Sequence, residues 1–275
     1  MQVEVAMKLI SDKDLQADCE QCFGLCCVAL PYAKSSDFAF QKAAGVPCRN
    51  LEDDFRCSIH KELRTKGFRG CSVYECFGAG QKVAKQTYSN KNWRDHEDIA
   101  QEMFEVFPIM QQLHEILYYL NEAMDREETA SFHADIEKAF HSIEDLTYLS
   151  PAALLELDIQ HHRSQINPLL VQTSEVIRAK HTRKHRKLPK ELIGANLSNK
   201  AIQGVPLRGA LLIATDFNNT DLRGADFLGA DLRDANLSGA DLRECIFLTQ
   251  AQLNAAKGDS ETKLPLHLRH PAHWS

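Results

Sequence analysis

Four cysteines stand within nine residues near the start of the chain, in the segment CEQCFGLCC, residues 19–27. A cysteine can be a small buried side chain, a redox thiol, half of a disulfide bond or a soft metal ligand. Burial alone does not require two cysteines three positions apart, so this crowding favours metal binding. Eight of the nine cysteines lie before residue 77, at Cys19, Cys22, Cys26, Cys27, Cys48, Cys57, Cys71 and Cys76.

The spacing C-x2-C lets two sulfur atoms reach one ion on a tight turn, and thiolates prefer zinc, copper(I) or iron-sulfur clusters. Eight thiolates could hold two tetrahedral ions, or one cluster and one zinc ion. The adjacent Cys26 and Cys27 point in different directions, so they would serve different ions or one of them would be a core residue. His60, three residues after Cys57, is a candidate substitute ligand. A thiol redox relay is the alternative use of these cysteines.

The series C-x2-C-x3-C-C, followed by PC at Cys48, CSIH at Cys57 and GCSVYEC at Cys71 and Cys76, resembles the YkgJ-like cysteine-cluster family. The resemblance covers residues 19–78. It implies a zinc- or iron-chelating domain in which all eight cysteines are metal ligands, and flagellin lysine N-methylases are similar to the same family. The resemblance implies an Arg-Pro pair shortly before the seventh cysteine, but this sequence has FRG there. The departure affects the expected shape of the local turn more than the expected metal binding by the cysteines.

Composition indicates a folded protein without a strong overall charge. The 275 residues are 44% hydrophobic, and the formal net charge is -6. This mild acidity does not draw the chain to nucleic acid or to an anionic membrane. No basic segment with a long apolar stretch opens the chain, and no run approaches the roughly 18 apolar residues of a spanning helix. We therefore expect a cytoplasmic protein, in which thiols stay reduced.

A helical period follows the cysteines. From Asp95 to Met124, apolar residues recur three or four positions apart, which predicts a long amphipathic helix that Pro108 should bend. A second helix is expected through residues 132–143. Residues 91–180 should then form a helical hairpin or a small bundle.

Two Pro-containing segments predict further helix starts in this region. In SPAALLELD, Ser150 is the expected N-cap and Pro151 the first helical residue. INPLL repeats the pattern, with Asn167 as the expected cap and Pro168 as the first residue of a fourth helix.

Histidines and acids in the helical region are weaker candidates for metal binding. His133, Glu137 and His141 lie on one predicted helix face, and Asp158 precedes His161 by three. A di-iron bundle needs two Glu-x-x-His units and two further glutamates, and this set is incomplete. We expect these side chains to be solvated or hydrogen-bonded.

The basic segment RAKHTRKHRKLPK, residues 178–190, contains no acid. It could bind phosphate groups. A solvated helix end followed by a linker is the favoured interpretation, because basic residues suit a helix C-terminus and Pro189 ends the helix. His181 and His185 belong to this linker segment.

Large apolar residues then recur every five positions from Leu192 to Phe247, with a small residue two positions before most of them. Neither a helix nor a flat strand has this period. A coil that turns a corner every five residues would point both positions inward, which predicts a solenoid. Cys245 occupies one of the small positions and is expected in the core, not at a metal.

The segments ADFLG, ADLRD, ANLSG and ADLRE are similar to the pentapeptide-repeat motif A(D/N)LXX. The resemblance covers residues 190–249 and implies a right-handed quadrilateral β-helix with four pentapeptides per coil. Twelve repeat centres give three coils, a stack only about 15 Å tall. Thr249 and Gly258 should bracket a short helix that covers the last coil, and Trp274 should pack back on the solenoid.

The expected fold class is α+β and multidomain. Its parts are a cysteine-rich metal-binding domain, a helical region, a basic linker, a pentapeptide-repeat β-helix with its cap, and a C-terminal tail, at residues 1–90, 91–180, 181–189, 190–258 and 259–275.

The sequence favours a cytoplasmic metal-binding protein that holds zinc, iron or an iron-sulfur cluster and docks a protein or peptide on its solenoid. One alternative is an iron or iron-sulfur enzyme that modifies a docked peptide or protein. Another is a DNA-mimicking topoisomerase inhibitor, which would suit a longer and more acidic solenoid, because residues 190–249 hold eight acids against six bases. Whether the metal is catalytic or structural, and the oligomeric state, stay open.

Overall fold

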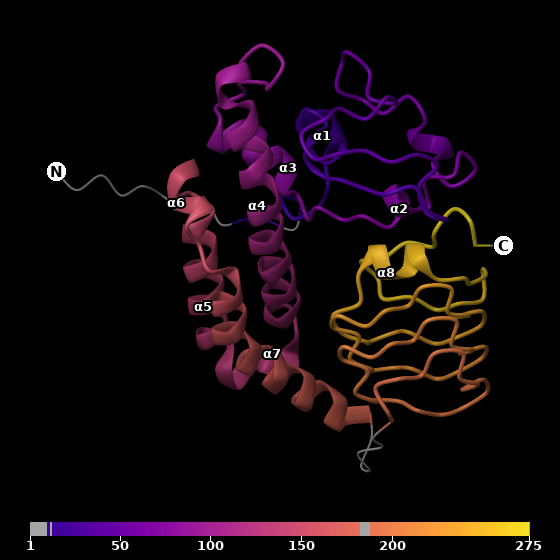
Figure 1. Ribbon diagram of the computed structural model, residues 1–275. Helices are drawn as coiled ribbons and strands as arrows, with labels where there is room; N and C mark the ends of the chain where they lie inside the picture. The colour runs from indigo at the N-terminus through magenta and orange to yellow at the C-terminus, as the bar shows by residue number, and fades with distance from the viewer. Residues whose placement is uncertain (1–9, 12, 182–187, 275) are drawn as a thin grey trace. The chain divides into compact units, whose positions relative to one another are not determined.

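The computed structural model describes residues 10–11, 13–181 and 188–274, and the chain divides into two compact units (Figure 1). The first unit holds most of the cysteine-rich segment and of the helical region, and the second holds the five-residue repeat. Their ranges are Met1–Gly67, Cys76–Asn121 and Ala134–Ile166 for the first unit, and Phe68–Glu75, Glu122–His133 and Asn167–Ser275 for the second.

The cysteine-rich segment consists of loops, short helical turns and two isolated antiparallel bridges, Tyr32 with Lys42 and Leu51 with Cys57. Its helical elements are η1 (Cys19–Gln21), α1 (Leu25–Ala29), η2 (His60–Glu62), α2 (Arg69–Ser72), α3 (Ala79–Lys82) and the π-helix η3 (Val83–Thr87).

A row of aromatic rings packs the loops of the first unit onto its helices. The ring of Phe55 lies 5.4 Å from Phe23 and 5.6 Å from Trp93, and Trp93 lies 5.6 Å from Phe104. The Trp93 indole N–H also donates to the Phe23 carbonyl oxygen at 2.8 Å. Aromatic pairs at this distance stabilise a core beyond their buried area. The row therefore stiffens a segment that has few regular elements.

The helical region contains α4 (Glu97–Met124), η4 (Glu127–Phe132), α5 (His133–Leu146), α6 (Pro151–Leu155) and α7 (Ile159–His181). The long first helix and the second helix are confirmed, and α4 continues through Pro108. Ser150 caps α6 as expected, because its hydroxyl accepts the backbone N–H of Ala153. Across the described residues, no helix is long and apolar enough to span a membrane.

The predicted helix start at INPLL is wrong, because α7 runs unbroken through Pro168. A proline inside a helix removes one backbone hydrogen bond and costs about 3 kcal/mol. The buried side chains of α7, Ile159, Ile166, Leu170 and Ile177, form one stripe on both sides of Pro168 and offset that cost. The Asn167 side chain does not cap a helix and instead accepts a hydrogen bond from Arg208, in the second unit, at 2.6 Å.

The repeat forms stacked coils in the second unit (Figure 1). Between residues 191 and 246, isolated parallel bridges join residues 20 positions apart, so one coil takes four pentapeptides, as predicted. The two bridges to Lys257 and Lys263, after the repeat, span 21 and 22 positions. Within the described residues these bridges do not extend into continuous strands. The right-handed sense of the coil stays a prediction. The bridges form four columns, which are Glu191, Leu211 and Asp231; Asn196, Asp216, Asn236 and Lys257; Ala201, Asp221, Asp241 and Lys263; and Pro206, Asp226 and Ile246.

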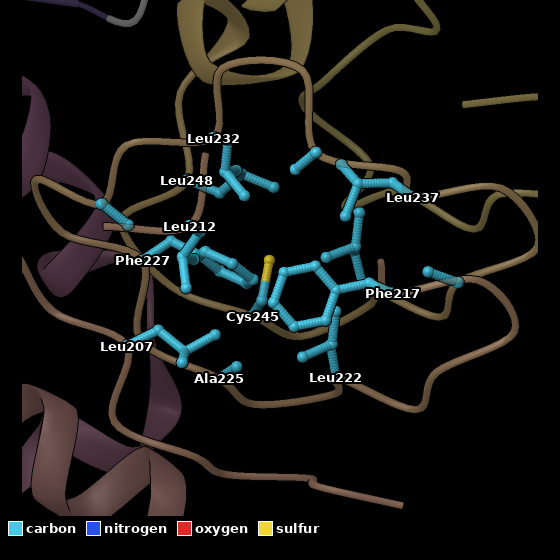
Figure 2. Close-up of a cluster of buried hydrophobic side chains, with 14 of the residues drawn as sticks. Leu207, Leu212, Phe217, Leu222, Ala225, Phe227, Leu232, Leu237, Cys245 and Leu248 are labelled. Atoms are coloured by element: carbon cyan, nitrogen blue, oxygen red, sulfur yellow. The ribbon is translucent and has the colours of Figure 1, made fainter. Parts of the chain in front are cut away.

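The interior of the coils is filled by the large and small residues of the repeat (Figure 2). Leu222 and Phe227 are fully buried, and Leu232 and Cys245 are each 1% exposed. Burial raises the pKa of the Cys245 thiol well above its ordinary value, so it stays protonated in this apolar setting. The five-residue register and the core position of Cys245 are confirmed.

The last coil is covered by α8 (Gln250–Ala255), which carries a full capping box between Thr249 and Gln252. The Gln252 amide also donates to the carbonyl oxygens of Phe227 and Ala230, so the helix is bonded to the coil beneath it. Trp274 packs on the solenoid core and donates its indole N–H to a backbone oxygen at 3.1 Å. The predicted covering helix and tail contact are both present.

The ends of two helices lie against the fourth column within the second unit. The Ser174 hydroxyl of α7 donates to the buried Asp226 carboxylate at 2.7 Å, and Arg178 donates to the Gly204 carbonyl oxygen at 2.9 Å. Glu122 of α4 accepts the backbone N–H of Phe247. These buried polar contacts fix one side of the coil stack.

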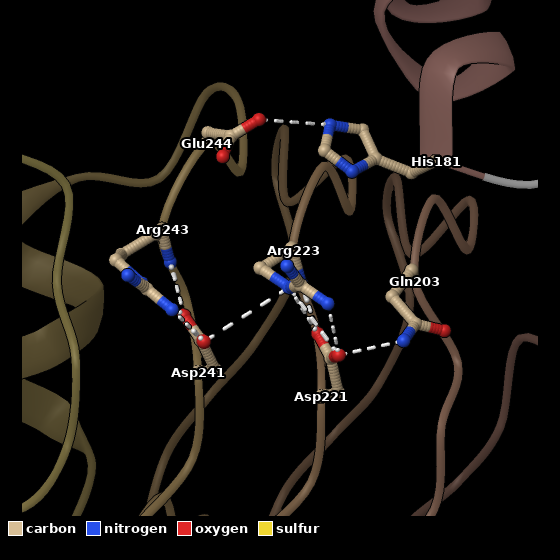
Figure 3. A network of polar contacts seen from close by, with 7 residues as sticks. All are labelled: His181, Gln203, Asp221, Arg223, Asp241, Arg243 and Glu244. Atoms are coloured by element: carbon tan, nitrogen blue, oxygen red, sulfur yellow. Dashed lines mark hydrogen bonds and ion pairs between the residues drawn. The ribbon is translucent and has the colours of Figure 1, made fainter.

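A polar network lies on the third column (Figure 3). Arg223 pairs with Asp221 at 2.7 Å, and Arg243 pairs with Asp241 at 2.6 Å. His181, the last residue of α7, lies 3.3 Å from Glu244. Of the linker that the sequence predicts at residues 181–189, residues 182–187 and therefore His185 lie outside the described part of the chain.

Candidate metal centre

The structure places seven of the eight candidate cysteines in the first unit and Cys71 in the second. Cys19 opens η1, Cys26 and Cys27 lie in α1, and Cys71 lies in α2. The remaining cysteines occupy turns and loops, at Cys22, Cys48, Cys57 and Cys76. All nine cysteines of the chain belong to the described residues, and none of them forms a disulfide bond.

Two Cys-Phe-Gly turns have the same backbone shape. The first is residues 22–24 and precedes α1; the second is residues 76–78 and precedes α3. In each turn the phenylalanine and the glycine both have positive φ, 52° and 62° in the first and 50° and 81° in the second. A Cβ atom on Gly78 would lie 1.8 Å from the Asp14 carbonyl oxygen, so only glycine fits there. The two turns are neighbours, because the charge of Cys76 acts on Cys22.

Backbone N–H groups point at several of the sulfur atoms. The N–H of Gly24 lowers the pKa of the Cys22 thiol, and that of Asn50 donates to the Cys48 sulfur at 3.5 Å. Cys57 likewise accepts the N–H of Ile59. In each case a donor lies two residues after the cysteine. Such donors stabilise a thiolate over a thiol and orient a sulfur ligand from behind.

Cys27, Cys48 and Cys57 form one group of neighbours. The Cys48 N–H donates to the Cys27 carbonyl oxygen at 2.9 Å, and Cys57 is bridged to Leu51, three residues after Cys48. Burial raises the pKa of Cys57, and the charges of Cys27 and Cys48 raise it further. A half-buried thiol such as Cys57, with two other cysteines whose charges oppose its ionisation, is costly to ionise without a cation.

Cys26 and Cys27 lie with their sulfur atoms 3.9 Å apart. Their hydrogen bond raises the pKa of Cys26 well above its ordinary value and lowers that of Cys27. The charge of Lys42 also lowers the pKa of Cys27. The adjacent pair thus consists of one sulfur that holds its proton and one that releases it more readily.

The donor chemistry of this segment fits a soft metal ion, since it offers several sulfur atoms backed by backbone N–H groups. Among the described residues, however, no three His, Cys, Asp or Glu side chains lie close enough together to hold an ion. His60 is exposed in η2. Seven of the eight predicted cysteine ligands therefore lie in one unit, but in the described part of the chain they do not form a ligand set.

Two of the three candidate histidines in the helical region, His141 and His161, have local hydrogen-bond partners. His141 Nδ1 lies 3.1 Å from the buried Glu144 carboxylate, and the Asp158 carboxylate accepts the backbone N–H of His161. His133 and Glu137 are exposed. These positions match the expected solvated or hydrogen-bonded roles.

Two buried residues near the cysteines were missed by the sequence reasoning. The Lys42 ammonium donates to three backbone carbonyl oxygens, and the His114 Nδ1–H donates to the Phe77 carbonyl oxygen at 2.7 Å. Burial lowers the pKa of His114 to about 4, so the ring is neutral. Neither residue belongs to a motif, and a lone Lys or His in a sequence gives no signal of burial.

Comparison with known proteins agrees with the coil geometry. The family model of pentapeptide repeats, which spans eight copies, matches residues 191–227 and 210–247. This chain is a pentapeptide-repeat protein. The uncharacterized protein YybG of Bacillus subtilis (strain 168) is 58% identical over 280 residues, with all of both chains covered, so this pentapeptide-repeat protein and YybG belong to one family.

Two solved structures are similar to part of the pentapeptide-repeat protein. Alr5209, a pentapeptide repeat protein from Nostoc Pcc 7120, is 32% identical over 34% of this chain and 87% of its own, with a TM-score of 0.24. Rfr23, from the cyanobacterium Cyanothece 51142, is 25% identical over 28% of this chain and 56% of its own, with a TM-score of 0.20. At these TM-scores the two structures add nothing to the description of the fold.

Proposed function

We propose that this pentapeptide-repeat protein binds zinc or iron, as separate ions or as an iron-sulfur cluster, through its cysteine-rich segment. The observation that supports this most is the gathering of seven cysteines in one unit, where their charges act on one another. Cys22, Cys27, Cys48, Cys57 and Cys76 would hold the metal together with Cys19 and Cys26, the other cysteines of the first unit. Bound metal would cross-link loops that have little regular structure of their own.

The proposal requires the cysteine loops to close around the ion, because the thiols are not yet a ligand set. The first unit keeps its aromatic row and its long helices as a fixed base for that movement.

A protein or peptide partner would dock on the solenoid. Ile193 and Leu211, on the first two coils, are 58% and 39% exposed, unlike the repeat centres beside them. DNA mimicry receives no support from the coil surface, because Asp221, Asp231 and Asp241 are each paired with the arginine two residues later. A surface that neutralises its own acids lacks the negative field of a duplex.

Metal analysis of protein prepared without oxygen, combined with absorption spectra, tests the proposal. We expect at least one equivalent of zinc or iron, and a reduced content in Cys48→Ser and Cys57→Ser proteins. Cys245→Ala is the matched control, because alanine occupies the equivalent coil position in neighbouring repeats and this thiol lies in the solenoid core. Metal content below one equivalent, with all eight thiols of the segment titrating freely, would refute the proposal.

A further inference from the structure

Lys42 is a buried charged residue in the loop between α1 and Cys48. It is 7% exposed, and its backbone exchanges two hydrogen bonds with Tyr32, at 2.8 and 3.0 Å. The Tyr32 hydroxyl in turn donates to the Cys48 sulfur at 3.3 Å. A lysine is seldom this buried, because the ammonium loses its hydration.

All three protons of the Lys42 ammonium have an acceptor. They donate to the carbonyl oxygens of Val28 at 2.8 Å, Val46 at 2.9 Å and Ala43 at 3.0 Å. Val28 directly follows Cys27, and Val46 lies two residues before Cys48. One side chain therefore ties together the two segments that carry these cysteines, alongside the bond from the Cys48 N–H to the Cys27 carbonyl oxygen.

The carbonyl oxygens satisfy the donors of Lys42 but carry no net charge. A buried cation still costs several kcal/mol unless anions lie near it. Conversely, thiolates gathered around a divalent ion carry excess negative charge, which a nearby ammonium offsets. The Val28 carbonyl oxygen, which accepts from the Lys42 ammonium at 2.8 Å, belongs to the residue directly after Cys27. The buried ammonium is stabilised by a nearby negative charge, and a thiolate centre is stabilised by a nearby positive charge.

We propose that Lys42 is a positioning residue of the cysteine centre, which holds the Cys27 and Cys48 segments together and offsets thiolate charge when they bind a metal ion. The inference rests on the proposed function. It gives a reason why a lysine is buried where an apolar residue would cost less to bury.

Two substitutions of Lys42 separate the effect of its hydrogen bonds to the two segments from the effect of its positive charge. Lys42→Gln keeps an amide donor without charge, and Lys42→Arg keeps the charge, although its planar fork cannot reproduce three bonds from one atom. Lys34→Gln, in the same loop and exposed, is the matched control. Zinc affinity of each protein is measured anaerobically by competition with a chromophoric chelator. For a variant that is unfolded without zinc, the zinc concentration at half-maximal folding replaces the dissociation constant.

We expect Lys42→Gln to bind zinc at least about tenfold more weakly than the natural protein, Lys42→Arg to lie between them, and Lys34→Gln to be unchanged. A Lys42→Gln protein that binds as tightly as the natural one overturns the inference and leaves the proposed function standing. So does failure of both Lys42 variants to fold at saturating zinc, since the role of Lys42 is then only structural. A natural protein that binds neither zinc nor iron overturns the proposed function itself.

Discussion

The cysteine-rich segment and the solenoid are stabilised by different kinds of contact. In the solenoid each coil repeats the same apolar pair, and bridges 20 residues apart link it to the next. The segment of residues 19–67 has two isolated bridges, short helical turns and an aromatic row instead. One region owes its stability to repetition, and the other to a few specific contacts.

The two regions also differ in whether their cysteines are available for metal binding. The solenoid buries its one cysteine among leucines and phenylalanines, where the thiol is inert (Figure 2). The first unit has cysteines in turns and loops as well as in short helices, and the backbone N–H of Asn50 donates to one of these sulfur atoms, that of Cys48. A region with few regular hydrogen bonds has spare donors, and these spare donors suit a ligand site.

Removal of metal should produce the largest difference between the two regions. A structural zinc ion contributes roughly 10 kcal/mol or more, and the thin core of residues 19–67 cannot replace that amount. We expect hydrogen exchange in residues 19–67 to accelerate by about 100-fold or more after chelation. The coils of residues 192–247, which need no ligand, should keep their protection.

Hydrogen exchange before and after chelation resolves the two regions in one sample, so the solenoid serves as the internal control. If residues 19–67 keep their protection after all metal has been removed, the metal is not structural. An activity that disappears at the same time would then assign the centre a catalytic role.

A single core truncation should have the next largest effect. Leu222 is fully buried in the coil interior. We expect Leu222→Ala to lower the free energy of unfolding of the second unit by about 2 to 5 kcal/mol, because a buried cavity adds to the lost transfer energy. Urea denaturation measures this change. A loss below about 1 kcal/mol would contradict the inward register of the repeat.

The free energy of unfolding of the second unit should depend on pH, because Glu122 is buried. Burial raises the pKa of this carboxyl to about 7, although Arg126 and the Phe247 N–H act in the opposite direction. Between about pH 4.5 and 7, the unfolded chain is ionised at this residue while the folded chain is protonated. Unfolding therefore releases a proton, and stability falls as pH rises through this window, by about 3 kcal/mol in total.

Glu122→Gln removes this titration while keeping a side chain of the same shape. The difference in unfolding free energy between the natural protein and the variant should change with pH from about 4.5 to 7 and be constant above it. A constant difference across this window would show that folding does not raise the pKa of Glu122 above its value in the unfolded chain.

Much of the solenoid could be predicted from the sequence, because a five-residue period leaves one way to bury all its members. The same pattern correctly placed Cys245 in the core and not at a metal. The helix start at Asn167 was predicted wrongly, because local capping signals cannot weigh a buried stripe that continues past Pro168. Propensity in that segment yields to tertiary packing.

The metal-binding role of the eight cysteines stays a prediction of the sequence. Cysteine spacing identified the sulfur atoms, but it carried no information about the segment that places Cys71 in a different unit from the rest. In that segment Arg69 pairs with Asp234 of the solenoid, a contact between residues 165 positions apart. The burial of Lys42 is likewise a property of the folded loops and not of any local pattern.

The smallest expected effect concerns the outer surface of the coils. Arg233 pairs with Asp231 at 2.6 Å, yet its side chain is 59% exposed. Exposed ion pairs contribute little, because water and salt screen them and the side chains lose freedom. We expect Arg233→Ala to change the free energy of unfolding by less than about 1 kcal/mol, far below Leu222→Ala in the same urea titration. An effect as large as that of the leucine would mean that the surface pairs, and not the interior, hold the coils together. If the effect is small, the coil surface is free to vary without loss of stability, which is the property a docking surface needs.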